Sequence, residues 1–233
     1  MAGKLFGVGV GPGDPELITR KAWSIISNAK VVAYPMLEDA SSFARRIASD
    51  AISPDAKEIQ IVIPMSVERL PAQKAYDQGA ELIAAELDVG QDVVVLCEGD
   101  PFFYGSFMYL HARLSDKFEV EVIPGVSSIT ACAASAQLPL SARNEVLTVI
   151  PGPLEGKQLE DAIDGAEAIA IMKVGRHLSK IKSTIQKMGL LDDAWFVEYA
   201  SLPQQKVMKL EETGDKAPYF SMILISKGKD PWL

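Results

Sequence analysis

The sequence is poor in the residues that build disulfide and metal sites. Among 233 residues there are only two cysteines, Cys97 and Cys132, and two histidines, His111 and His177. Neither cysteine has the spacing of a disulfide framework or a zinc site, and two separate histidines do not form a cluster. Both cysteines lie in apolar surroundings, so we expect two buried free thiols and no metal cofactor.

Long apolar runs are also missing. No stretch is long enough to cross a bilayer. The N-terminal segment lacks the extended hydrophobic region and the cleavage site of a signal peptide, and it is better explained as a first strand. A cytoplasmic protein is therefore expected.

Positive charge is the minority sign. The chain has 23 Lys and Arg against 31 Asp and Glu, a formal net charge of −8. A negative field of this kind argues against non-specific binding of nucleic acid. It still allows an anionic small substrate, because a local group of Arg and Lys can dominate one cleft.

What the chain does have is 48% hydrophobic residues, enough to build the core of one large or two compact domains. The first half alternates strand-like and helix-like segments, which predicts a parallel sheet. Residues 92–97 form an almost unbroken apolar run, typical of a central parallel strand. Strands are expected at 5–10, 31–34, 58–63, 92–97 and 119–123. Helices are expected at 15–28, 40–51, 104–114 and 126–137, with one long helix whose apolar stripe holds Tyr76, Ala80, Ile83 and Leu87.

The pattern changes near residues 138–146. Strands at 147–150 and 168–172 and a helix at 177–188 are followed by three strand-like segments without helix-length spacers, which predicts mixed pairing. We therefore expect an α/β protein of two α/β domains: residues 1–140 with a parallel sheet and 141–233 with a mixed sheet. A ligand cleft is expected between them.

The first candidate site is the glycine-rich segment 7–22, which follows a strand and opens a helix. Gly9, Gly11 and Gly13 have the wrong spacing for a dinucleotide fingerprint, and no GK[ST] follows, so a P-loop is excluded. A tight turn without a ligand explains this segment as well as a binding loop does.

Four further segments end strands with residues suited to binding: 97–106, 124–128, 168–176 and 198–205. Each has a simpler explanation alone, since Asp100, Ser127 and Ser128 could cap helices and Met172 could belong to the core. Ligands of open α/β sheets bind at the carboxyl ends of strands, so the five segments together indicate one binding site.

Read together, these five segments resemble the tetrapyrrole (corrin/porphyrin) methylase family, whose motifs occur here in order over nearly the whole chain. The resemblance implies two α/β domains, S-adenosylmethionine as methyl donor, a tetrapyrrole substrate and a homodimer. It also implies the positions that meet the cofactor: Pro12, Glu98, Gly99, Asp100, Tyr104, Ser127, Ser128, Met172 and Ala200, with Ser221 and Met222 added on the last strand.

Segments 31–35, 43–48, 63–66 and 99–110 resemble the branch of this family that methylates precorrin-2, or its cobalt form, at C20 in cobalamin synthesis. Uroporphyrinogen-III enzymes typically have the sequence GGDPFVFGRG in this segment. In this chain Glu98 stands in place of the first Gly, and Tyr104, Gly105 and Ser106 stand in place of Phe-Gly-Arg. The alternatives are another acceptor, such as uroporphyrinogen III, and a non-catalytic module that binds S-adenosylmethionine.

A tetrapyrrole carries many carboxylates, so Arg and Lys near the strand ends are natural partners. Arg20 and Arg176 are our candidates, and solvated surface charges are the alternative for both. Asp14 and Glu98 are hypotheses for a general base, and no catalytic residue is assigned.

Overall fold

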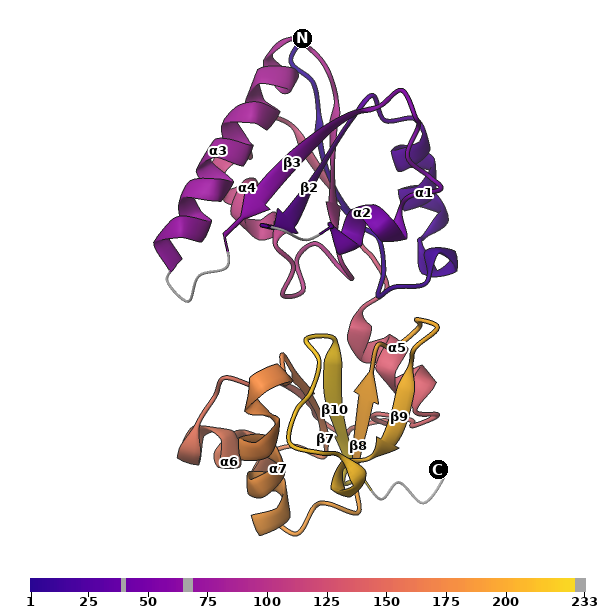
Figure 1. Ribbon diagram of the computed structural model, residues 1–233, viewed down its shortest axis with the longest axis vertical. Coiled ribbons are helices and arrows are strands. Elements are labelled where there is room, and N and C mark those ends of the chain that lie inside the picture. Colours follow the sequence, from indigo (N-terminus) through magenta and orange to yellow (C-terminus); the bar gives the residue numbers. More distant parts are fainter. Residues whose placement is uncertain (39–40, 65–68, 229–233) are drawn as a thin grey trace. The chain divides into compact units, whose positions relative to one another are not determined.

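The computed structural model describes residues 1–38, 41–64 and 69–228. The chain divides into two compact units, residues 1–127 and 128–233, each with its own five-stranded sheet (Figure 1). The α/β class with two sheets is confirmed. The domain limits expected from the sequence, 1–140 and 141–233, stay a prediction.

The sheet of the first unit is entirely parallel, with the strand order β3-β2-β4-β1-β5. Its central strand β4 is buried at all five positions, as its unbroken apolar run predicts. The strands are β1 (Leu5–Gly9), β2 (Val31–Leu37), β3 (Lys57–Ile63), β4 (Val93–Cys97) and β5 (Val120–Ile123).

Helices cover both faces of this sheet. On one face pack α3 (Arg69–Asp88) and α4 (Phe107–Leu114), and the predicted stripe from Tyr76 to Leu87 is buried there. On the other face pack α1 (Arg20–Ser27) and α2 (Phe43–Ile47) (Figure 1). Alternate residues of β4 serve the two faces, because successive side chains of a strand point in opposite directions.

The prediction of one helix over residues 15–28 is wrong. This segment is divided into a short 3₁₀ helix, η1 (Pro15–Leu17), and α1, with extended backbone at Ile18 and Thr19 between them. Asp14 accepts the Glu16 N–H at 2.9 Å and Thr19 accepts the Ala22 N–H at 3.2 Å. Two capping residues five positions apart thus start two helices.

The strand expected at 31–34 does not stop at proline. β2 runs through Pro35, which pairs with Ile61 of β3, whereas pairing with β4 covers only Val31–Ala33. Pro35 lies beyond the part of β2 that pairs with β4. Its missing backbone N–H therefore removes no hydrogen bond to β4 and is tolerated. The helix expected at 40–51 is shorter, because Ser42 caps α2 and the helix ends at Ile47; Ala40 lies outside the described residues, as do Met65 and Ser66.

The second unit has a mixed sheet of order β6-β7-β10-β8-β9, as predicted. β6 and β7 are parallel, and the other neighbours are antiparallel. The strands are β6 (Leu147–Pro151), β7 (Ala168–Met172), β8 (Ala194–Glu198), β9 (Lys206–Lys209) and β10 (Ser221–Ser226). The helices are α5 (Ser128–Ser135), α6 (Gly156–Asp164), α7 (Leu178–Lys187) and the 3₁₀ turns η2 (Gly175–His177) and η3 (Leu210–Glu212).

Each face of this sheet has its own apolar layer. α6 and α7 bury Leu159, Ile163, Ile181 and Ile185 on one face, and α5 packs Ile129 and others on the opposite face. The sequence analysis did not anticipate α6, which is short and has only a narrow apolar stripe.

Both cysteines are free and buried, as predicted. Burial raises the pKa of the Cys97 thiol, and it raises that of Cys132 to about 12. In the part of the chain that the structure describes, no helix has both the length and the apolar character needed to span a membrane.

Candidate cofactor and substrate site

A tight cradle of glycines lies at the carboxyl ends of three parallel strands in the first unit. A Cβ atom at Gly125, after β5, would lie 2.0 Å from the Gly99 carbonyl oxygen, and one at Gly9 would lie 2.6 Å from the Gly125 nitrogen. No residue but glycine fits such an approach. The ends of β1, β4 and β5 therefore pack backbone against backbone at these glycines.

Two of the loops above this cradle are bridged to each other. The Gly99 N–H donates to the Gly11 carbonyl oxygen at 2.8 Å, and the Gly11 N–H donates in return at 3.3 Å. Both glycines have positive φ, 81° at Gly11 and 61° at Gly99. Pro12 comes directly after this bridge, so the structure brings the first and second predicted segments together.

Asp100 fixes the loop that leaves β4. Its Oδ1 accepts the N–H groups of Phe102 and Phe103 at 2.9 and 3.1 Å, and its Oδ2 accepts the Gly125 N–H at 3.1 Å. α4 begins only at Phe107, so Asp100 does not cap a helix as the simpler explanation supposed. It holds a loop and joins two strand ends instead.

The same loop carries an exposed aromatic surface. Tyr104 has a φ of 56°, a left-handed conformation that a non-glycine residue adopts at a cost of about 1–2 kcal/mol. Its ring meets that of Phe103 edge-on, with centroids 5.3 Å apart. Strained residues of this kind concentrate at functional sites, which keeps this loop a candidate binding segment.

Glu98 directly follows β4, next to the cradle. Desolvation raises the pKa of its carboxyl, while the N–H of Ala44 and the charge of Arg46, both on α2, act in the opposite direction. Solvent still reaches the side chain. The desolvation therefore comes from protein packed around the carboxyl rather than from full enclosure.

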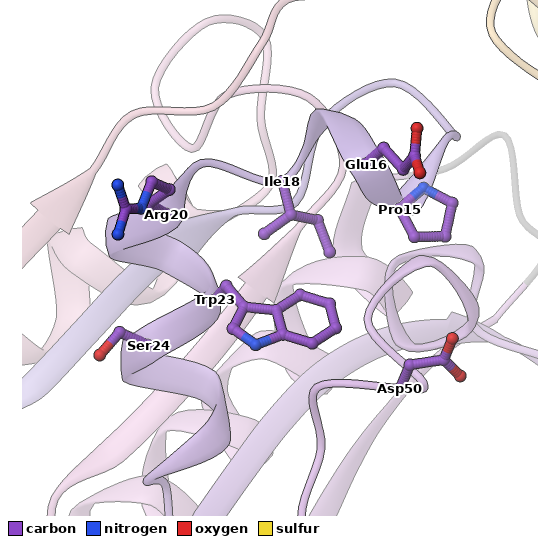
Figure 2. Close-up of a pocket in the computed structure, with 7 residues that line it drawn as sticks. All are labelled: Pro15, Glu16, Ile18, Arg20, Trp23, Ser24 and Asp50. Carbon is purple, nitrogen blue, oxygen red and sulfur yellow. The ribbon is translucent and has the colours of Figure 1, made fainter.

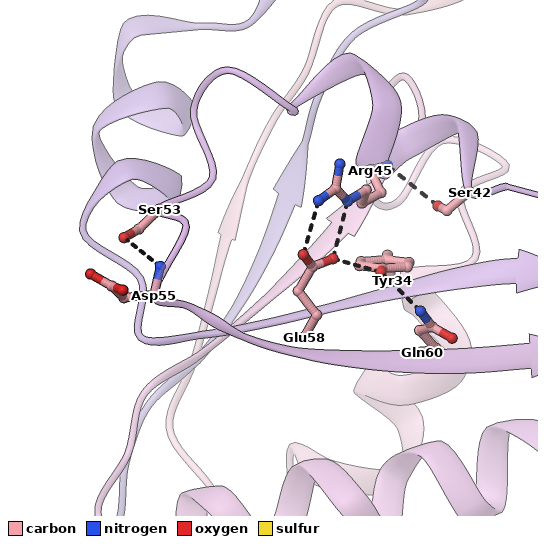
Figure 3. Close-up of polar contacts among 7 residues, drawn as sticks. All are labelled: Tyr34, Ser42, Arg45, Ser53, Asp55, Glu58 and Gln60. Atoms are coloured by element: carbon pink, nitrogen blue, oxygen red, sulfur yellow. Dashed lines mark hydrogen bonds and ion pairs between the residues drawn. The ribbon is translucent and has the colours of Figure 1, made fainter.

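A polar network that the sequence analysis missed anchors α2 (Figure 3). Arg45 binds Glu58 of β3 through two hydrogen bonds, Nε to Oε2 at 3.1 Å and Nη2 to Oε1 at 2.9 Å. The Tyr34 hydroxyl donates to Glu58 Oε2 at 2.6 Å, and Gln60 Nε2 donates to that hydroxyl at 3.5 Å. The alternation of Glu58 and Gln60 on one side of β3 was the available signal, but it does not identify Arg45 as the partner.

The second unit brings together its own set of predicted positions. Met172, at the end of β7, is paired in register with Met222 of β10, and Ser221 is paired with Glu198 at the end of β8. Ala200 belongs to the same apolar cluster as both methionines. Of the two predicted β10 positions, Met222 therefore lies beside Met172 and Ser221 lies beside Glu198.

The backbone beyond these strand ends is strained. Lys173, directly after β7, has a φ of 57°, and Tyr199 and Ser201, after β8, have φ of 51° and 67°. Gln205 Oε1 holds this turn by accepting the Ser201 N–H at 2.8 Å and the Ser135 hydroxyl at 2.7 Å. These left-handed residues were not found from sequence, since none of them is glycine.

Of the paired serines, Ser127 lies in the segment after β5 and Ser128 is the first residue of α5. Arg176 lies in η2 with an exposed side chain, its Nε 3.5 Å from His177 Nε2. Within the described residues, no group of three or more His, Cys, Asp or Glu is arranged to hold a metal ion.

Arg20 lies at the start of α1, in an open pocket of about 630 Å³ (Figure 2). Ile18 lies beside the Trp23 indole in this pocket, and Asp50 lies across it from α1. None of the cradle glycines lines it. Arg20 thus shares a pocket with Pro15 and Glu16 of η1, the short helix that follows the Gly11 turn.

A unit with a parallel sheet followed by a unit with a mixed sheet defines a class of two-unit α/β proteins. The chain belongs to the Tetrapyrrole (Corrin/Porphyrin) Methylases, whose family pattern matches residues 4–213.

Individual relatives agree with this assignment. The chain is 40% identical to a precorrin-2 C(20)-methyltransferase from Sinorhizobium sp, over 98% of this chain and 97% of that protein. It is 32% identical to a probable cobalt-precorrin-2 C(20)-methyltransferase from Methanocaldococcus jannaschii, over 97% of each. The fold matches a uroporphyrin-III C-methyl transferase from Thermus thermophilus, solved with S-adenyl homocysteine, with a TM-score of 0.72 at 23% identity over 97% and 98% of the two chains.

Proposed function

We propose that this protein transfers a methyl group from S-adenosylmethionine to C20 of precorrin-2, or of its cobalt form, in cobalamin biosynthesis. One observation carries the proposal: 40% identity over almost the full length of both chains to a protein named for this reaction. The likeness to the uroporphyrin-III enzyme is lower, 23%, and supports the fold alone.

The first unit suits a cofactor held largely through its backbone. A Cβ at Gly9 or Gly125 would clash with neighbouring backbone, and Asp100 fixes the loop above these glycines. In the first unit we propose Pro12, Glu98, Gly99, Asp100, Tyr104 and Ser127 as cofactor positions. In the second unit we propose Ser128, Met172, Ala200, Ser221 and Met222.

The chemistry demands mainly positioning. S-adenosylmethionine supplies a methyl group already activated by its sulfonium, and the reduced macrocycle is electron-rich. The task of the protein is then to align donor and acceptor and to exclude water. The exposed rings of Phe103 and Tyr104, which meet edge-on, offer apolar surface for one partner.

The carboxylates of the substrate need cationic partners. We propose Arg20 and Arg176 for this role, because both are exposed beyond a strand end: Arg20 begins α1 after β1 and η1, and Arg176 lies in η2 after β7. We also propose that the protein acts as a homodimer in the cytoplasm, without a metal cofactor of its own.

The deciding experiment is methyl transfer from labelled S-adenosylmethionine, with precorrin-2, its cobalt form, precorrin-3 and uroporphyrinogen III as parallel acceptors. Label on precorrin-2 or its cobalt form alone is the expected result, and the preferred form identifies the pathway. Label on uroporphyrinogen III would replace the proposed acceptor. Tight cofactor binding without transfer to any of them would indicate a binding module.

A further inference from the structure

One segment of the second unit is basic in an otherwise acidic chain. Residues 168–191, which include β7, η2 and α7, contain no Asp or Glu, whereas the whole chain has 31 acidic residues against 23 basic ones. The segment holds five cationic residues and one histidine: Lys173, Arg176, His177, Lys180, Lys182 and Lys187. A local excess of one charge sets the sign of the potential at that surface, so this segment attracts anions in spite of the net charge of the chain.

The ammonium group of Lys180 is fixed beside the carboxyl end of β7. Its Nζ donates to the carbonyl oxygens of Gly152 and Leu154 at 3.0 and 2.6 Å. The Gly152 N–H in turn donates to the carbonyl oxygen of Met172, the last residue of β7, at 2.7 Å. Glu155 lies 3.8 Å from Nζ, but its side chain is largely exposed, so solvent screens the pair. The Lys180 charge therefore stays close to a proposed cofactor position and is little compensated.

Arg176 and His177 lie next to each other in η2, between β7 and α7. Arg176 Nε is 3.5 Å from His177 Nε2. Desolvation lowers the pKa of His177, the charges of Lys180 and Arg176 act in the same direction, and the charge of Glu155 opposes them. The imidazole is therefore neutral at neutral pH and stands in a positive field.

The fold does not use the His177 side chain to cap α7. His177 is the residue that precedes this helix, yet its side chain makes no capping hydrogen bond. The space at the nearby Gly175 is open: its φ is 35°, and no atom of the described residues would lie within 4 Å of a Cβ added there. A ligand group therefore has room next to Gly175, one residue from Arg176.

We propose that Arg176 and His177 together bind one carboxylate of the tetrapyrrole substrate, and that Lys180 strengthens this site through its fixed charge. The inference rests on the proposed function and adds His177 to the residues that meet the substrate. The guanidinium supplies a charge-assisted hydrogen bond, and the imidazole N–H supplies a second one. Two donors on adjacent residues fix a carboxylate more narrowly than one long side chain does, so the site orients the macrocycle as well as holding it.

The first test inserts a negative charge into the open space. Gly175→Asp and Gly175→Asn add side chains of similar shape that differ in charge, and both residue types accept left-handed backbone more readily than most non-glycine residues. We expect the KM for precorrin-2, or its cobalt form, to be about tenfold higher in Gly175→Asp than in Gly175→Asn, with similar kcat. The added carboxylate repels that of the substrate, so the ratio should shrink in about 0.5 M salt.

The second test removes the imidazole. His177→Ala should raise the same KM about fivefold or more, because one of the two donors is lost. Lys187→Ala is the matched control, since it removes an exposed positive charge about 15 Å further along α7, and it should leave KM within about twofold. The affinity of both variants for S-adenosylhomocysteine, measured by calorimetry, should stay within about threefold of the original.

A third measurement needs no turnover. The chain has two histidines, so the imidazole signal that disappears from the ¹H NMR spectrum of His177→Ala belongs to His177. Uroporphyrin III, a stable tetrapyrrole with carboxylate side chains, should shift this signal in the unchanged protein and raise the pKa of His177, because a bound carboxylate favours the protonated imidazole. Binding should therefore tighten as the pH falls from about 7.5 to about 6 in the unchanged protein, and not in His177→Ala.

Opposite results are equally clear. Equal KM values in Gly175→Asp and Gly175→Asn, or a titration with uroporphyrin III that leaves the His177 signal in place, would overturn the site. Inorganic phosphate that shifts this signal equally at the same concentration would overturn the assignment to the substrate. Failure of the unchanged enzyme to methylate any tetrapyrrole would overturn the proposed function, whereas the NMR titration would still decide whether Arg176 and His177 bind a carboxylate.

Discussion

Asp100 and Gly125 join the ends of two strands that are not neighbours in the sheet. Asp100 Oδ2, after β4, accepts the Gly125 N–H, after β5, at 3.1 Å, and β1 lies between those strands. The first prediction follows from this bond. Asp100→Ala leaves three backbone donors without their acceptor and should destabilise the first unit by about 1–3 kcal/mol. Urea unfolding measures the change.

Asp100→Asn is the graded comparison, because an amide keeps one acceptor oxygen. It should unfold at a urea concentration between those of Asp100→Ala and the original protein. Equal midpoints for all three proteins would show that the bonds of Asp100 do not stabilise the fold.

The glycine cradle makes a second prediction. Gly125→Ala places a Cβ 2.0 Å from the Gly99 carbonyl oxygen, so backbone must move, at a cost of about 1–3 kcal/mol or more. Gly214→Ala is the control, since nothing lies within 4 Å of its Cβ, and it should change stability by no more than about 0.5 kcal/mol. Thermal unfolding and S-adenosylhomocysteine binding of both variants measure these effects. Similar losses of stability in the two variants would show that the close backbone approach at Gly125 has no special importance.

The Arg45–Glu58 pair makes a prediction about pH. Hydrogen bonds from Arg45 hold the pKa of Glu58 below its ordinary value. The stabilisation is therefore fully present above the unfolded value of about 4.3 and is lost as the pH falls through the lower folded-state pKa. Glu58→Gln should cost about 1 kcal/mol or less at pH 7, because the pair is partly exposed.

That cost should shrink as the pH falls below about 4. Urea unfolding of both proteins from pH 7 to pH 3 measures it. A cost that stays constant over this range would show that the charge of Glu58 plays no part.

The buried thiols make a fourth prediction. With the pKa of Cys132 raised to about 12, only about one thiol in ten thousand is ionised at pH 8. Neither Cys132 nor Cys97 should react quickly with Ellman's reagent in the folded protein, and both should react at once in guanidinium. Rapid reaction of one equivalent in native buffer would show that a cysteine is accessible.

The two arginines proposed to meet substrate carboxylates make a fifth prediction. Arg176→Ala and Arg20→Ala should each raise KM for the tetrapyrrole about tenfold, as expected for a lost charge-assisted hydrogen bond, and leave cofactor affinity unchanged. Lys187→Ala, at the end of α7, is the matched control. An unchanged KM in either variant would show that this arginine is a solvated surface charge that does not bind the substrate.

Much of the fold could be predicted because it depends on local patterns. The apolar run of β4 and the stripe from Tyr76 to Leu87 each report burial directly, since the period of a strand or helix decides which side chains share a face. The five strand-end segments were recognised from short motifs of neighbouring residues. The errors at Pro35 and over residues 15–28 arose where pairing partners and competing caps decided the outcome.

The sequence by itself determined the α/β class, the mixed second sheet and the family, because periodicity and short motifs are properties of neighbouring residues. Only the tertiary structure decided that Asp100 ties two strand ends together, that Arg45 meets Glu58, and that Lys173 and Tyr199 take left-handed backbone. Those features depend on atoms that are distant along the chain and adjacent in space, and no local pattern encodes their distances.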